Sequence, residues 1–244
     1  ELLDVAGGLN SEATMIRFSS GDGFKATFTL QEFLGETRYT FPNFMDSGLP
    51  GHLIGDTTGA WEVPAIIAHH SSSGHSMGEV QNDNNLRDQD ANLLLYGQRA
   101  VTQQTNARFA KYVNKIEVLT GPPSQWAKPT ASVEPGEVPA GTLVELHSPN
   151  DDEDKVHYTL DGSDPTIESP MYNWIAKRWW PSRSDDLYEI NRPIEITQNT
   201  TIKAIVIGPG RLDSEIVEFI YTVEESPTVA VTGVSITQGD QTLE

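Results

Sequence analysis

The sequence predicts an α+β domain followed by an all-β antiparallel sandwich, and three observations support this division. The second half contains runs of alternating apolar and polar residues rich in β-branched side chains, at 156–161, 200–207 and 216–223. Glycine, proline and aspartate separate these runs, as is typical of sandwiches. The first half mixes strand patterns with short helical patterns, and three prolines within 122–129 stiffen a linker between the halves.

The predicted boundaries follow from these changes of pattern. Because the chain opens at Glu1 inside a helical pattern that ends at Gly7 and Gly8, we expect it to be a piece of a longer polypeptide. The expected parts are a first domain at 1–121, a linker at 122–130, a sandwich at 131–224 and a tail at 225–244.

The first domain should begin with a β-hairpin. Strands are predicted at 15–18 and 24–29 around a Gly-Asp-Gly turn. Thr29 is placed to cap a short helix at 30–34, with Glu32 at the third helical position. A strand within 109–119 should close the domain, with its apolar side chains pointing inward: Val113, Ile116 and Val118.

Composition limits the possible partners. The net charge is −19, which repels phosphate backbones, so we expect no nucleic-acid partner and some attraction for divalent cations. No apolar run is long enough to span a membrane. The absence of cysteine excludes disulfides and thiolate metal sites within this stretch.

In the second half, the turn after the first sandwich strand has a clear chemistry. Asp161-Gly162 and Asp164-Pro165 predict a positive φ at Gly162 followed by a fixed φ. The turn belongs to the first of four segments that follow one another along the chain: YTLDGSDPT (158–166), SPMY (169–172), ITQNTTIKAIVIGPGRLDSE (196–215) and FIYTV (219–223). Together, from about 128 to 223, they resemble the fibronectin-III-like C-terminal domain of chitobiases and β-hexosaminidases. The resemblance implies a sandwich without catalytic residues, and a shared fold does not transfer a function.

The first half carries a second resemblance. The hairpin segment 15–34, followed by LLLYGQRAV (93–101) and KYVNKIEVL (111–119), is similar to the molybdopterin-binding fold of the sulfite oxidase family over about 2–119. That resemblance would place the family's metal-binding cysteine before Glu1. The glycines of a phosphate cradle are missing, so we expect no bound cofactor. The positive charges that this region offers are Arg99, Arg108, Lys111 and Lys115.

The tail carries a third resemblance. The segment 229–236 looks like the opening strand of a bacterial group-2 immunoglobulin-like domain. Together the three resemblances describe a modular bacterial cell-surface protein, whose partners would include neighbouring domains of the same polypeptide.

Two groups of residues are candidates for metal binding. His69, His70 and His75 form the densest histidine cluster and can share a transition metal, or they lie in a polar surface loop. Asp161 and Asp164, with the acidic run 151–154, can donate oxygens to calcium. The competing interpretation gives both aspartates a role in the turn itself, and the loop 46–56 is an equal calcium candidate.

A tryptophan-rich segment at 173–189 is the candidate ligand site. Tryptophans flanked by arginines stack on sugars or peptides, but they also form interfaces between domains. We favour packing against the first domain, because three indoles in water would be a costly exposed patch. The residues concerned are Trp174, Arg178, Trp179, Trp180 and Arg183.

No catalytic motif is present, so the sequence predicts a non-catalytic structural or adhesive module. We expect an extracellular, bacterial cell-surface location, with polysaccharide or cell-wall polymer as a ligand. One alternative is a fragment of an extracellular molybdopterin-dependent oxidoreductase. Another is an accessory region of a glycan-degrading enzyme.

Overall fold

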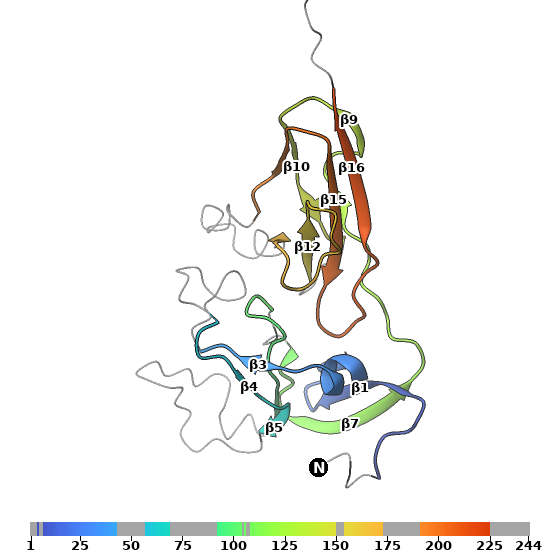
Figure 1. The fold of residues 1–244 in the computed structure, drawn as a ribbon. Coiled ribbons are helices and arrows are strands. Elements are labelled where there is room, and N and C mark those ends of the chain that lie inside the picture. The colour runs from blue at the N-terminus through green and yellow to red at the C-terminus, as the bar shows by residue number, and fades with distance from the viewer. Residues whose placement is uncertain are drawn as a thin grey trace, which may run out of the picture.

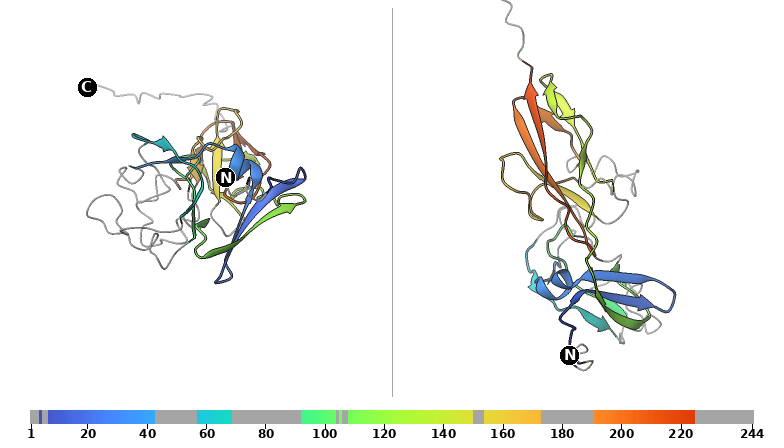
Figure 2. Two further views of the ribbon diagram at one scale, coloured as in Figure 1. Left: turned by 90° about the horizontal axis from the view of Figure 1, so that it is seen from below. Right: turned by 90° about the vertical axis from the view of Figure 1, so that its right-hand side faces the viewer.

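The computed structural model describes residues 4, 7–42, 57–68, 92–103, 105, 108–149, 154–172 and 191–224. Two units lie end to end, the first at the bottom of Figure 1 and the sandwich above it. The right-hand view of Figure 2 shows the same elongated arrangement, and the left-hand view looks at it from below. Each unit has a hydrophobic core of its own. In this part of the chain no helix is long and apolar enough to cross a bilayer.

The first unit is built on a three-stranded antiparallel sheet with the order β2-β1-β7. The predicted hairpin is confirmed, with Gly23 at φ 92° in its turn. Alternation along the hairpin places Ile16 opposite Phe28 on the buried face, whereas Arg17 lies opposite Thr27 on the other face. The strands are β1 (Ala13–Ser20), β2 (Lys25–Thr29) and β7 (Val113–Thr120).

Aromatic side chains fill the core beneath this sheet. The ring centroids of Phe28 and Tyr96 lie 4.8 Å apart, and Phe33 lies 5.1 Å from Phe18 and from Phe28. Two short ladders border the core, one formed by β3 and β4 and the other by β5 and β6. Their strands are β3 (Tyr39–Thr40), β4 (Trp61–Glu62), β5 (Ile66–Ala68) and β6 (Leu93–Leu95).

The predicted helix after β2 is present as a five-residue π-helical turn, η1 (Gln31–Gly35). The hydroxyl of Thr29 accepts a hydrogen bond from the N–H of Glu32 at 3.0 Å, as expected of a capping residue. The described residues otherwise contain almost no helix, and they form a mostly β structure. The α+β fold class predicted for the first domain is therefore supported only in its β component.

The expectation that the apolar side chains of β7 are buried is met only in part. Val113 is buried, but Ile116 and Val118 are 38% and 36% exposed. Both lie opposite buried residues of β1, namely Phe18 and Ile16. Because β7 is at the edge of the sheet, only one neighbouring strand shields it.

The second unit is the expected sandwich. One layer is a five-stranded sheet of order β13-β12-β15-β16-β9, in which β9 joins parallel to β16 and the other pairs are antiparallel. Two two-stranded ladders, β10-β14 and β11-β8, complete it. The strands are β8 (Thr130–Ala131), β9 (Gly136–Val138), β10 (Thr142–Val144), β11 (Leu146–His147), β12 (Lys155–Thr159), β13 (Met171–Tyr172), β14 (Ile194–Ile196), β15 (Thr200–Ile207) and β16 (Val217–Val223).

The linker is part of the sandwich rather than a free tether. Trp126 is 2% exposed and belongs to the sandwich core. Its backbone N–H donates to the carbonyl oxygen of Leu212, whose own N–H donates to Ser124. The guanidinium of Arg211 lies 4.2 Å from the Trp126 ring centroid, in cation–π geometry.

Candidate functional site

The two units meet at the turn that joins β15 to β16. This turn contains Gly208-Pro209-Gly210, and Gly210 adopts φ 80°, a conformation that glycine enters without strain. The backbone N–H of Gly210 donates to Glu32 Oε2 at 2.8 Å. A side chain at Gly210 would not fit, since an added Cβ would lie 2.7 Å from the carbonyl oxygen of Thr27.

Glu32 is held in place by its own helical turn. The side chain is buried although it carries a carboxylate. Arg38 Nη2 lies 3.4 Å from Glu32 Oε1 and donates to the Glu32 carbonyl oxygen at 3.0 Å. The helical turn therefore presents the second carboxylate oxygen to the sandwich.

Arg38 connects several parts of the first unit. Its Nη1 donates to the Gly97 carbonyl oxygen at 3.3 Å and to Gln103 Oε1 at 3.0 Å. Its guanidinium also lies 5.3 Å from the Tyr96 ring centroid. Because its planar group serves acceptors from several segments, Arg38 fixes their relative positions.

The charged network continues into the sandwich. Glu36 Oε2 lies 3.5 Å from Arg38 Nη2 and 3.4 Å from Arg99 Nε. Arg99 Nη2 in turn lies 4.0 Å from Asp213 Oδ1, on the β15–β16 connection. We call the five residues of this network the junction cluster: Glu32, Glu36, Arg38, Arg99 and Asp213.

The junction cluster contains three carboxyl groups and two guanidinium groups. Burial raises the pKa of Glu32 above its ordinary value of 4.5, opposed by the Gly210 N–H and by both arginines. Burial likewise raises the pKa of Asp213, and Arg99 opposes the shift. Because the pKa values of both Glu32 and Asp213 are raised, we expect the stability of this junction to depend on pH.

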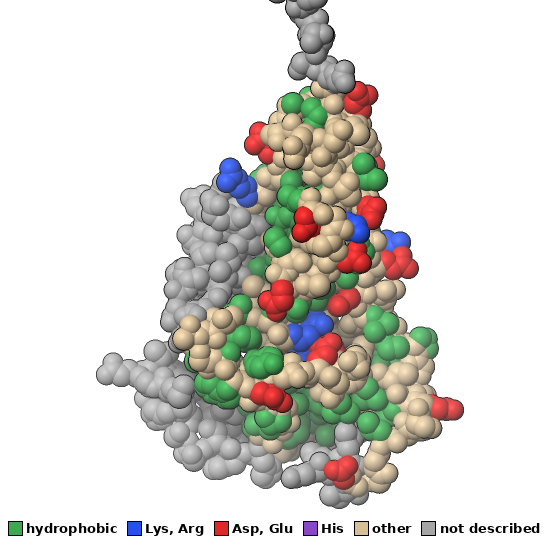
Figure 3. Space-filling view, viewed as in Figure 1, with side chains coloured by type: hydrophobic (Ala, Val, Ile, Leu, Met, Phe, Trp, Pro, Cys, Tyr) green, Lys and Arg blue, Asp and Glu red, His purple; other side chains and the backbone are tan. Residues whose placement is uncertain are grey.

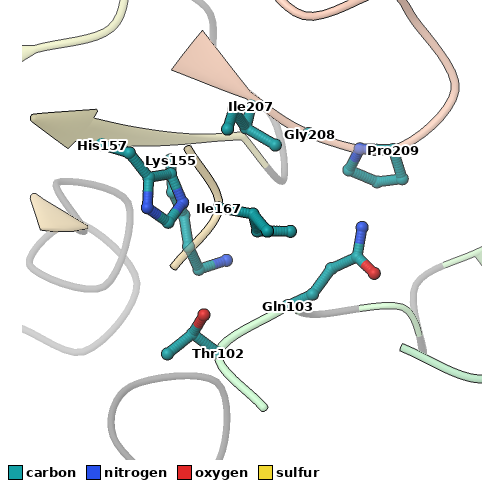
Figure 4. A pocket seen from close by; sticks show the side chains of 8 residues that line it. All are labelled: Thr102, Gln103, Lys155, His157, Ile167, Ile207, Gly208 and Pro209. Carbon is teal, nitrogen blue, oxygen red and sulfur yellow. The ribbon is translucent and has the colours of Figure 1, made fainter. Parts of the chain in front are cut away.

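A second contact between the units lies at β12. Lys155 and His157 point toward Thr102 and Gln103 of the first unit, with Ile167 between them (Figure 4). The cavity enclosed there measures about 10 Å³, which is room for roughly one water molecule.

His157 is buried, although the alternation of apolar and polar residues at 156–161 is typical of a half-buried strand. Its Nδ1–H donates to the Ser169 carbonyl oxygen at 3.0 Å. Burial lowers the pKa of His157 to about 4, with Lys155 and Arg99 acting in the same direction against the Ser169 hydrogen bond. The imidazole is therefore neutral at pH 7. The β12 polar face is covered because the first unit packs near it, which the strand's own period does not reveal.

The predicted turn at Asp161 is confirmed in its geometry. Gly162 adopts φ 84°. Asp161 Oδ1 accepts hydrogen bonds from the Ser163 N–H at 3.0 Å and the Ser163 hydroxyl at 2.6 Å, and these bonds lower the pKa of Asp161. Asp164 instead forms an ion pair with Lys203 at 2.8 Å. The two aspartates thus have different protein partners.

The other predicted site residues lie outside the described part of the chain. They are the histidines His69, His70 and His75, and the residues of the tryptophan segment, Trp174, Arg178, Trp179, Trp180 and Arg183. The loop 46–56 and the tail 225–244 lie outside it as well. Among the residues that are described, no group of three or more His, Asp or Glu side chains is arranged to hold a metal ion.

Three of the four positive charges that the sequence offers near a phosphate site form contacts with protein groups. Arg99 belongs to the junction cluster, and Arg108 Nη2 donates to the Pro209 carbonyl oxygen at 3.3 Å. Lys115 forms an ion pair with Glu117 at 2.7 Å. Nothing in the described structure supports a molybdopterin-binding fold.

The fold defines the second unit as a β-sandwich module. The family model described as Fn3 associated matches residues 144–229, from the last residue of β10 to just beyond β16. This part of the chain is therefore an Fn3-associated domain similar to the C-terminal domain of chitobiases, a kind of module that is typically a non-catalytic accessory domain. The comparison with curated proteins found no match for the chain.

The sequence did not single out the junction cluster. The patterns mark Glu32 only as a residue of the first helical turn and Arg99 only as one of several positive charges. A usable signal was the turn itself, in which Arg211 and Asp213 follow a Gly-Pro-Gly segment. A turn that carries charged residues often contacts another part of the protein or a partner, because binding residues are concentrated in loops.

Proposed function

We propose that this chain is a non-catalytic accessory module of a secreted bacterial surface protein, and that its two units act as one rigid body. The ligand we propose is a carbohydrate or a cell-wall polymer. The Fn3-associated domain supports the accessory role, since such modules support other parts of surface proteins or glycan-active enzymes.

The observation that carries the rigid-body part of the proposal is the hydrogen bond from Gly210 to the buried carboxylate of Glu32. Domains within one chain normally move relative to each other unless their interface is extensive. Here a charge-assisted hydrogen bond from Gly210 to Glu32 and the ion pair between Arg99 and Asp213 cross the junction. Such contacts favour one orientation, because turning the sandwich would leave buried charges without partners.

Small-angle scattering tests the rigid arrangement. The scattering profile of the whole chain should fit one orientation of the units, and Gly210→Ala should broaden the distribution of interatomic distances. Gly162→Ala is the matched control, because it has a similar φ and open space around it. If Gly210→Ala leaves the profile unchanged, the junction does not hold the units together.

A binding assay tests the ligand. The chain should be retained by members of a panel of insoluble polysaccharides and purified cell walls, without releasing reducing sugar from them. The double variant Trp179→Ala/Trp180→Ala examines the sequence-based proposal of a stacking platform. Failure of every panel member to retain the chain would refute the ligand part of the proposal, and sugar release would refute the non-catalytic part.

A further inference from the structure

A groove of about 390 Å³ opens where the first sheet, the linker and the β15–β16 turn meet. Its basic residues are Arg17 and Lys25 from the sheet, Arg108 from the segment before β7, and Arg211 from the turn. These are four of the 16 basic residues in a chain of net charge −19. We call this feature the basic groove. Figure 3 shows acidic side chains spread over the visible face of the sandwich.

The arginines of the basic groove are held by their own contacts. Arg17 Nε donates to the Thr27 hydroxyl at 2.9 Å, and Arg211 stacks on Trp126. Arg108 donates to Pro209. Side chains that are already positioned lose less conformational entropy when they bind a ligand, so the groove is pre-organised for an anion.

Nearby acids do not cancel this charge. Glu117 lies opposite Arg17 in the sheet, and the hydrogen bond from Lys115, more than the charge of Arg17, lowers the pKa of its carboxyl group. The Glu117 carboxylate is bonded to Lys115, however, and Glu117 does not line the groove. The carboxylate of Glu32 accepts the Gly210 N–H and pairs with Arg38. The groove therefore keeps an excess of positive charge.

We propose that the basic groove binds a carboxylated polysaccharide, with uronate carboxylates on the arginines. This inference rests on the proposed carbohydrate binding and names its ligand class. Guanidinium groups bind carboxylates through paired N–H donors. Sugar hydroxyls would find partners in the hydroxyls of Thr27 and Ser124, which also line the groove. A volume of this size holds a small number of sugar units.

Two other classes of anion fit less well. Nucleic acid carries dense charge along its length, and the net charge of −19 repels it outside the groove. An acidic peptide would need apolar pockets or a free strand edge, the usual means of peptide recognition. Met15 and Pro122 are the large apolar side chains in the lining. The Thr27 carbonyl oxygen on β2 is covered by Gly210. A carboxylated glycan, whose charges are spaced one to a sugar ring, is the best match.

Titration calorimetry with hexagalacturonate tests the proposal on the whole chain, with the methyl-esterified hexamer as a neutral probe of the same shape. Binding should weaken at least about tenfold on esterification, and by a similar factor in Arg17→Gln/Lys25→Gln. Added salt should weaken it further. The matched control is Lys128→Gln/Lys203→Gln, which removes the same charge outside the groove and should bind normally. The single variant Lys25→Gln changes an exposed residue and should give a smaller loss of affinity. It keeps the test decisive if the double variant misfolds.

Several results would overturn the inference. If the esterified hexamer binds as tightly as hexagalacturonate, the carboxylates play no role in binding. If the control variant loses as much affinity as the groove variant, the overall charge of the protein alone attracts the ligand. Tighter binding of a glutamate hexapeptide would make the site a peptide site. If neutral polysaccharides bind but hexagalacturonate does not, the inference fails while the proposed function stands. If neither binds, both fail.

Discussion

Replacing Gly210 by alanine should destabilise the protein more than its backbone conformation alone requires. Two separate effects act at this residue. Alanine at φ 80° is strained, and its Cβ would lie 2.7 Å from the Thr27 carbonyl oxygen and 3.1 Å from Arg108 Nη1. The second effect can be relieved only if the turn moves away from the first unit, which lengthens the bond from Gly210 to Glu32.

The magnitude follows from these two effects. Backbone strain alone costs about 1 kcal/mol. Loss of a hydrogen bond to a charged acceptor costs a further 1.5–3 kcal/mol or so, since the buried carboxylate loses a donor. We therefore expect a loss of about 3 kcal/mol, or roughly 6–12 °C in melting temperature for a chain of this length. Gly162→Ala, at φ 84° with no atom within 4 Å, should lose only about 1 kcal/mol.

Urea unfolding followed by circular dichroism measures both variants against the parent chain. The informative quantity is the difference between the two variants, because backbone strain is common to both. A difference of about 2 kcal/mol supports the junction as described. Equal losses would refute the reasoning, because they would show that the contact at Gly210 adds nothing to stability.

Three further predictions concern buried charges. Arg38→Met should lose about 3–5 kcal/mol in urea unfolding, because it leaves Glu32 buried with less compensation. Lys115→Met, at a side chain that is 62% exposed, should lose much less, and a comparable loss would contradict the argument. The free energy of unfolding should fall by up to about 3 kcal/mol as the pH drops from about 6.5 to about 4. In this range the histidine of the unfolded chain becomes protonated, whereas buried His157 stays neutral. His157→Gln should abolish that acid-side loss, and an unchanged pH profile would mean that another group titrates. Glu32 acts in the opposite sense, since its raised pKa gives stability that is present below pH 4.5 and is lost as the pH rises through the folded value. Glu32→Gln keeps an acceptor for Gly210 and should flatten that part of the profile, and a steeper profile would contradict this assignment.

Local chemistry was enough to predict several elements. The hairpin of β1 and β2 follows from alternation around Gly21-Asp22-Gly23, and Thr29 caps the turn after it. The long strands β12, β15 and β16 follow from their β-branched alternation. These features depend on neighbours in the sequence, so the residues themselves determine them.

Burial was harder to predict. The period-2 pattern of β12 marked one polar face, but His157 on that face is buried. The same kind of pattern marked Ile116 and Val118 as inward, but both are exposed on an edge strand. A strand's period states which residues share a face, whereas the elements that pack against that face determine whether it is covered.

The sequence by itself determined the division into two units, the three sandwich strands β12, β15 and β16, and the positive φ at Gly162. Only the tertiary structure decided that Glu32, Arg99 and Asp213 meet, and that Arg17 and Arg211 line one groove. The physical reason is distance along the chain: Glu32 and Gly210 are 178 residues apart, and no local pattern relates them. Turn chemistry acts over a few residues, but the partners of buried charges are set by how two folded units dock.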